Sequence, residues 1–193
     1  MKKKLIYSLV ILASIFFAIS LVIFFKSSSH LRKDNLHSVR ARSGSEIKET
    51  VIINVKAFFF TDGPSLTRPV SAKLEVTPIK EVAYTKFLDF LFQGQEGCIT
   101  PIPPEVKLRS LYYLEKQHML ILDFSEELIA QFPGGSDSEL EFIYFIVDNM
   151  CYNFKEIQKV KFLVSGNEYP TLSGHIDLEN PFYPNYAFLD IDE

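Results

Sequence analysis

Residues 132–150, "FPGGSDSELEFIYFIVDNM", carry the pattern that decides the fold. A Pro-Gly-Gly turn is followed by Ser136 and, three residues later, by Glu139, which is the spacing of a capping box at a helix start. Apolar residues then recur at intervals of three and four, the period of one helix face. The stretch therefore predicts a helix whose buried face consists of Leu140, Ile143, Val147, Met150, Cys151 and Phe154.

A second helix is predicted upstream of this one. Thr77 can cap it and Pro78 occupies its first helical position, while Gly94 ends it. Its apolar stripe consists of Tyr84, Phe87, Leu88 and Leu91.

Five runs between turn signals predict strands, because apolar and β-branched residues alternate or cluster in them. They are residues 51–60, 66–76, 106–115, 118–124 and 159–166. Pro69 places the second strand best at an edge, and the polar link at Lys116 and Gln117 joins the third and fourth as a hairpin. The order of elements predicts one α+β domain, in which two helices pack on one face of a single sheet of about five mixed strands.

The N-terminus carries a long apolar run from Leu5 to Phe25. As a helix it would be about 31 Å long, which matches a hydrocarbon core of about 30 Å. We therefore expect a transmembrane anchor at residues 1–25, a flexible Ser-rich tether at residues 26–49 and the α+β domain with an extended tail at residues 50–193. A cleaved signal peptide is the alternative, although its apolar region is usually shorter. No cysteine follows the run, so a lipid-modified N-terminus is not expected.

Charge is distributed unevenly along the chain. Residues 50–193 contain eleven Lys and Arg against 21 Asp and Glu, whereas basic residues predominate in residues 1–49. So acidic a domain repels phosphate backbones, which argues against nucleic acid as a partner. Lysines flank the apolar run on one side and basic residues on the other, so the positive-inside rule alone leaves the orientation open.

Ser125, Ser173, His175 and Asp177, together with Asp123, raise the possibility of a serine hydrolase. Such an enzyme needs its serine on a strained turn beside a base, commonly within Gly-x-Ser-x-Gly, and "DFSEEL" lacks these glycines. The favoured interpretation is structural: Ser125 ends a strand and caps a short turn at residues 125–130, and His175 and Asp177 form local hydrogen bonds. No catalytic residue is therefore assigned.

Metal and anion sites are also weakly supported. His175 and Asp177 share a strand face, but the sequence supplies no third ligand. Gly134 and Gly135 precede a helix without the lysine of a phosphate loop, and acidic residues follow them. No metal or cofactor is therefore expected.

The chain has two cysteines, Cys98 and Cys151. They could pair in an exported domain, but buried free thiols are favoured. For Cys151, burial within an apolar helix face also argues against a nucleophile.

Aromatic residues suggest a binding module instead of an enzyme. Tyr112, Tyr113, Tyr183 and Tyr186 are candidates for exposed contact residues. The tail "NPFYPNYAFLDIDE", residues 180–193, either docks in a partner's groove or covers an edge of the domain's own core, and the second alternative is favoured.

The order of these motifs resembles the GerMN domain of GerM-type sporulation and spore germination proteins and related envelope proteins. The resemblance covers roughly residues 55–182. It is carried by Gly94, Gly97, Ile102, Pro103, the "DFS" of Asp123 to Ser125, Gly134, Gly135, Glu139, Val147, Asn149, Gly166 and the "GHID" of Gly174 to Asp177.

The resemblance implies a domain without established enzymatic activity that acts in assembly or organisation of the cell envelope. It favours a single-pass protein of the cytoplasmic membrane with the C-terminal domain on the extracytoplasmic side. The expected partners are the membrane and another envelope protein. A domain that binds a cell-wall glycan or a small ligand is the alternative.

Overall fold

The computed structural model describes residues 49–62 and 66–191. Within them the five predicted strands and both predicted helices are present. In chain order the elements are β1 Val51–Phe60, β2 Thr67–Val76, α2 Lys80–Gln93, β3 Leu108–Leu114, the 3-10 helix η1 Glu115–Gln117, β4 Met119–Phe124, α3 Glu127–Ala130, α4 Ser136–Asn153, β5 Lys159–Val164 and the 3-10 helix η2 Tyr186–Phe188.

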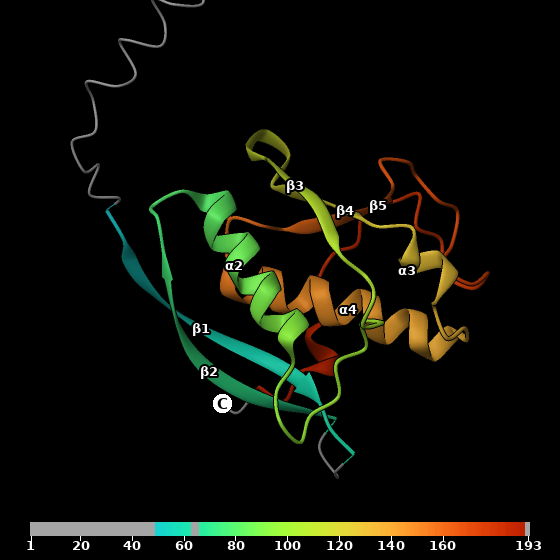
Figure 1. The fold of residues 1–193 in the computed structure, drawn as a ribbon, viewed down its shortest axis with the longest axis horizontal. Coiled ribbons are helices and arrows are strands. Elements are labelled where there is room, and N and C mark those ends of the chain that lie inside the picture. Colours follow the sequence, from blue (N-terminus) through green and yellow to red (C-terminus); the bar gives the residue numbers. More distant parts are fainter. Residues whose placement is uncertain (1–48, 63–65, 192–193) are drawn as a thin grey trace, which may run out of the picture. The chain divides into compact units, whose positions relative to one another are not determined.

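The five strands form two separate sheets. β1 and β2 pair as an antiparallel hairpin, while β4 pairs antiparallel with β3 and parallel with β5. The two helices lie between the sheets, since α2 contacts β2 and β3 and α4 contacts β1 and β5 (Figure 1). The α+β class is thus confirmed, whereas the single sheet with both helices on one face is wrong.

The burial of α4 explains why one sheet is not enough. Four residues of its predicted apolar face, Ile143, Val147, Met150 and Cys151, are buried, whereas Leu140 is only partly buried and Phe154 lies just beyond the helix end. Phe142, Phe145 and Ile146 are also buried and widen that face around the helix. A helix that is apolar around most of its circumference needs cover on more than one side. The β1–β2 hairpin supplies the cover that the three-stranded sheet cannot.

Both helix starts differ from the predictions. α2 begins at Lys80, with Ile79 as its N-cap, so Thr77 and Pro78 precede it. α4 begins at Ser136 after Gly135, and its capping box is absent because the side chain of Glu139 is fully buried in contacts with another loop. At the other end of α2, Gly94 is confirmed as the stop.

The chain after β5 folds back onto the domain. The backbone N–H and C=O of Phe182 pair with those of Val160 at 2.8 and 2.9 Å, and its ring packs against Phe162. Phe188 stacks on Tyr144, and the Thr67 hydroxyl donates to the Phe188 carbonyl at 3.2 Å. Phe182 and Phe188 therefore cover the domain's own core, as favoured, whereas Tyr183 and Tyr186 are exposed.

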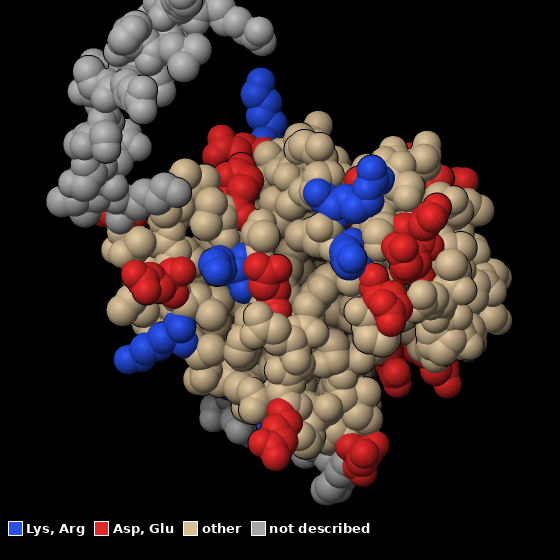
Figure 2. Space-filling model, in the orientation of Figure 1, with Lys and Arg blue, Asp and Glu red and all other residues tan. Residues whose placement is uncertain are grey.

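The predicted membrane span and nearly all of the predicted tether lie outside the described residues. Within the described part, no helix combines the length and the apolar character that a membrane span requires. Figure 2 shows acidic side chains gathered over α3 and the first turns of α4.

Candidate functional site

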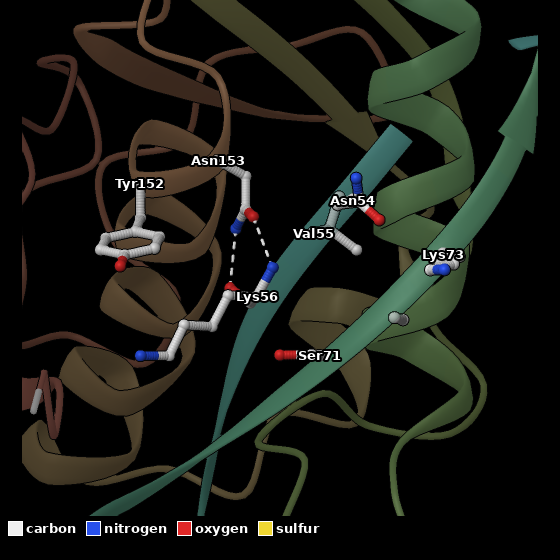
Figure 3. Close-up of a pocket in the computed structure, with 8 residues that line it drawn as sticks. Asn54, Val55, Lys56, Ser71, Lys73, Tyr152 and Asn153 are labelled. Atoms are coloured by element: carbon white, nitrogen blue, oxygen red, sulfur yellow. Dashed lines mark hydrogen bonds between the residues drawn. The ribbon is translucent and has the colours of Figure 1, made fainter. Parts of the chain in front are cut away.

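Two asparagines of α4 seal part of the free edge of β1. Because β1 pairs with β2 along one edge, alternate residues direct their N–H and C=O groups to the other edge. Asn149 Oδ1 accepts the Phe58 N–H at 2.8 Å, and its Nδ2 donates to the Phe58 carbonyl at 3.0 Å. Asn153 contacts Lys56 in the same way at 2.8 and 2.9 Å (Figure 3).

The helix positions both amides for this task. Residues four apart lie on the same helix face, so Asn149 and Asn153 approach β1 together. Each Nδ2 also donates at 2.8 Å to the carbonyl four residues earlier in α4, which fixes the orientation of the amide. At the end of β1, the Phe60 carbonyl accepts the Ile99 N–H at 2.8 Å. The edge is therefore closed from Lys56 to Phe60.

The remaining part of the same edge is open. Ile52 and Asn54 are the next alternate residues, and within residues 49–62 and 66–191 nothing pairs with their N–H or C=O groups. Ile52 is 66% exposed. An unpaired strand edge is a ready template for pairing with another chain. We define the open edge as Ile52 and Asn54.

A polar groove of about 560 Å³ borders the open edge on the outer face of the hairpin. Asn54 and Lys56 of β1 lie opposite Lys73 and Ser71 of β2, so these four side chains share one face. Figure 3 shows the Lys56 side chain beside Tyr152, and Ser71 directed toward Lys56. Neither Lys56 nor Lys73 forms an ion pair with a described carboxylate. The groove is therefore cationic within an acidic domain.

A smaller apolar pocket lies on the inner face of the hairpin, at the start of β1. Its volume is about 250 Å³. Lys80 and Glu156 also border it, and Glu156 accepts a hydrogen bond from the Tyr84 hydroxyl at 2.8 Å. Its apolar lining includes Val51, Ile53, Ile79, Ala83, Tyr84 and Phe154.

A family model described as "Germane: Sporulation and spore germination" matches residues 56–170, more than half of the chain. The chain belongs to the Germane family. This match confirms the resemblance to GerMN domains that the sequence motifs indicated. No curated protein matches the chain.

A structural comparison finds similar solved structures at low identity, the first of which shares the fold of this Germane domain. A candidate lipoprotein from Clostridium perfringens is 19% identical, with a TM-score of 0.50 over 78% of this chain and 99% of that one. The tandem GerMN domains of the sporulation protein GerM from Bacillus subtilis are 14% identical, with a TM-score of 0.49 over 67% of this chain and 45% of that one. The first GerMN domain of that protein is 16% identical, with a TM-score of 0.48 over 66% and 94%.

Three of the residues singled out as hydrolase candidates or as a helix cap meet in one cluster of the Germane domain. Glu139 Oε1 accepts the backbone N–H of Ser173 at 3.0 Å and contacts His175 Nδ1 at 3.0 Å. The Ser173 hydroxyl also donates to this oxygen, and Oε2 accepts the Ile176 N–H at 2.9 Å. Burial alone would raise the pKa of Glu139, but these hydrogen bonds lower it below its ordinary value.

This cluster holds a loop and lacks the geometry of a triad. In a triad the histidine uses one nitrogen for the serine and the other for the acid. Here Ser173 and Glu139 both face the same nitrogen, His175 Nδ1, and the serine hydroxyl already donates to the carboxylate. The buried Glu139 carboxylate therefore holds residues 173–176 in place by hydrogen bonds.

The other candidates have structural partners elsewhere. Asp123 accepts the Gly166 N–H at 2.7 Å and pairs with Arg109 at 3.3 Å. Asp177 accepts the N–H of Glu179 two residues ahead at 2.7 Å, as in the predicted local bonding. The Ser125 hydroxyl accepts the Lys107 N–H at 3.0 Å, and α3 has no side-chain cap, so the predicted capping role of Ser125 is wrong.

Both cysteines of the domain are free thiols, as favoured. Cys98 Sγ accepts a hydrogen bond from Arg68 at 2.9 Å. Burial raises the pKa of Cys151 to about 12, with a smaller contribution from Asp148, so this thiol stays protonated. In the described part of the chain, no cluster of three or more His, Cys, Asp and Glu could hold a metal ion.

Sequence reasoning missed the residues that shape the site. Asn149 was noted only as a family mark, while Asn153, Lys56 and Lys73 were not singled out. The available signal was an asparagine repeated at a spacing of four in the mostly apolar second half of a helix. Such amides are buried at a cost unless they are hydrogen-bonded, so their spacing indicates a partner with two regularly placed backbone groups.

Proposed function

We propose that this Germane-family protein is a non-catalytic interaction module of the cell envelope that binds another envelope protein through the open edge. In the proposal, residues 5–25 hold it in the cytoplasmic membrane and the domain faces the extracytoplasmic side. In a spore-forming host, its role would lie in sporulation or germination, the processes for which its family is named.

The single observation that carries the proposal is the unpaired edge at Ile52 and Asn54. The protein closes the rest of this edge with its own groups. Open edges are a liability that proteins usually cover, and adding a strand to one is a common way to bind an extended peptide. The serine, histidine and glutamate cluster, used up in holding a loop, supports a non-catalytic role.

Site-specific photo-crosslinking in cells tests this function. A photoreactive residue replaces Asn54 in the full-length protein, and a matched control carries it at the exposed Lys86 on α2. We expect an envelope protein to crosslink at position 54 and not at position 86. Equal crosslinking at both positions, or none at position 54, would contradict binding at the open edge.

The membrane part of the proposal needs a separate measurement. External protease added to intact protoplasts should cleave the domain, whereas a cytoplasmic marker stays intact. Removal of residues 1–25 should release the domain from the membrane fraction and abolish the crosslink at position 54. A domain that is protected in intact protoplasts would contradict the extracytoplasmic orientation.

Binding of a wall glycan or small ligand is the second candidate function. The observation that favours it is the groove lined by Lys56, Lys73, Asn54, Ser71 and Tyr152, since such polar and aromatic groups suit hydroxyl-rich or anionic ligands. Sedimentation of the full-length protein with purified wall material checks this function. Sedimentation no greater than that of a control protein would exclude it.

A further inference from the structure

The open edge lies between two concavities of opposite character. The cationic groove borders it on the outer face of the hairpin, and the apolar pocket borders it on the inner face. Asn54 belongs to the groove, whereas Val51 and Ile53 belong to the pocket. A segment that pairs with Ile52 and Asn54 would therefore meet both.

Strand geometry dictates which side chains meet which concavity. Successive side chains of a strand point to opposite faces of the sheet. In a segment added to β1, one set of alternate side chains would lie on the outer face beside Lys56 and Lys73. The other set would lie on the inner face beside the apolar pocket. A shift of one residue would exchange the two sets, so an alternating sequence also fixes the register.

The charges on the outer face of the hairpin favour acidic side chains in the outer set of an added segment. Lys56 and Lys73 lie on the same face of the hairpin and form no ion pair with a described carboxylate. Only Glu75, on the same face beyond Lys73, brings an acidic group to this side of β2. Carboxylates of an added segment would gain favourable interactions with both lysines, and lysines there would be repelled.

We propose that the partner presents an extended segment in which acidic and apolar side chains alternate, and that this segment pairs with the open edge. The inference rests on the proposed function and names the chemistry of its partner. The acidic side chains lie against Lys56 and Lys73, and the apolar ones enter the pocket lined by Val51, Ile53 and Phe154.

Charge also disfavours two other occupants. The protein's own residues 40–48 contain Arg40, Arg42 and Lys48 against Glu46, so they would bring cations to a cationic groove. A second copy paired through its own β1 edge would bring the same face, with Lys56 and Lys73 against Glu75, so it would add net positive charge instead of neutralising the groove.

Peptide binding to the full-length protein in detergent micelles tests the inference by fluorescence anisotropy. The probe is a labelled peptide of four Val-Asp repeats, the alternating acidic peptide. One control consists of four Val-Lys repeats, which reverse the charge. The other is a block peptide, four valines followed by four aspartates, which keeps the composition and removes the alternation. We expect the alternating acidic peptide to bind at least about fivefold more tightly than either control, because only this peptide satisfies the edge, the groove and the pocket together.

Variants of the protein locate the binding. Lys56→Glu combined with Lys73→Glu should weaken binding of the alternating acidic peptide by about fivefold or more, whereas Lys86→Glu combined with Lys107→Glu, elsewhere on the surface, should not. Asn54→Pro removes an N–H that points away from β2 and should weaken binding, while Asn54→Ala keeps this group and serves as its control. Circular dichroism melting confirms that each variant is folded.

The contrary outcomes are distinct. If an envelope protein crosslinks at position 54 but the three peptides bind equally, or none of them binds, the proposed alternation of acidic and apolar side chains in the partner is wrong. The proposed function would then still stand. Self-association that Asn54→Pro abolishes would assign the edge to a second copy. Binding of the alternating acidic peptide only after deletion of residues 26–48 would assign the edge to the protein's own tether. Each of these assignments would overturn the inference.

Discussion

Glu139 and Asp148 are both carboxylates on α4, and both are fully buried, but their surroundings have opposite effects. Glu139 accepts backbone N–H groups from Ser173, His175 and Ile176 in addition to side-chain contacts. Asp148 accepts one hydrogen bond, from the Asn185 N–H at 2.7 Å, and its Oδ2 has no partner among the described residues. Burial accordingly raises the pKa of Asp148 to about 6, whereas the pKa of Glu139 is lowered.

The comparison shows that the number of donors, and not burial itself, decides whether a buried carboxylate stabilises this domain. An ionised group in the interior is costly unless hydrogen bonds replace its lost water. Glu139 has such bonds and holds the loop at residues 173–176. Asp148 has one, and it holds the tail at Asn185 at the expense of an unsatisfied oxygen.

Removing the satisfied carboxylate should have the largest effect. We expect Glu139→Ala to lower the free energy of unfolding by about 3–5 kcal/mol, because it leaves several partly buried donors without an acceptor and opens a cavity in the helix face. Glu141→Ala, at an exposed position of the same helix, should change it by less than about 0.5 kcal/mol. Urea unfolding of both variants measures the difference. A small effect of Glu139→Ala would break the comparison.

A neutral side chain on the same helix gives the next largest effect. Asn149→Ala removes both partners of the buried Phe58 backbone groups, so we expect a loss of about 2–4 kcal/mol. Asn153→Ala should cost less, because the backbone of Lys56 is only partly buried and water can replace the amide. Equal losses in the two variants would show that the depth of burial at this edge does not matter.

The poorly satisfied carboxylate should give a gain. Asp148→Asn keeps an oxygen for the Asn185 N–H and removes the buried charge, so we expect stabilisation on the order of 2 kcal/mol at pH 8. At pH 4 the two proteins should be nearly equal. Thermal melting at both pH values measures the gain. A loss of stability at pH 8 would show that the ionised form is needed.

The two carboxylates should also leave opposite marks on the pH profile of stability. The folded pKa of Asp148, about 6, lies above its unfolded value of 3.8, so its contribution makes stability fall as the pH rises between these values. The folded pKa of Glu139 lies below its unfolded value of 4.5, so its contribution is lost as the pH falls below 4.5. Asp148→Asn should remove the first slope and Glu139→Gln the second. Profiles that remain unchanged would contradict both assignments.

The smallest effect is expected at His175, whose side chain is 48% exposed. His175→Ala should lower the free energy of unfolding by no more than about 1 kcal/mol, because the ring is half-exposed and water can take its place beside the carboxylate. Its backbone N–H still donates to Glu139. Urea unfolding at pH 6 and pH 8 provides the measurement. A loss comparable to that of Glu139→Ala would mean that the side chain, and not the carboxylate, organises the cluster.

The sequence predicted the elements whose signals are local. The strands follow from alternation, and the stripe of α2 follows from helical period. The division into two sheets depends on how much of the circumference of α4 is apolar. Phe142, Phe145 and Ile146 reveal this width only when they are added to the predicted face on a helical projection. The capping box failed because Glu139 bonds with residues 34 to 37 positions away. The open edge could not be predicted, since it is defined by contacts that span 91 and 97 residues.

The amide contacts of Asn149 and Asn153 match residues four apart on α4 to residues two apart on β1. Four helical residues advance about 6.0 Å, and two strand residues advance about 6.7 Å, so the two repeats agree closely over one step and drift apart over several. If α4 continued with the same spacing, residue 157 would lie opposite Asn54, but α4 ends at Asn153. The point at which α4 ends therefore determines how much of the β1 edge stays unpaired and available to a partner.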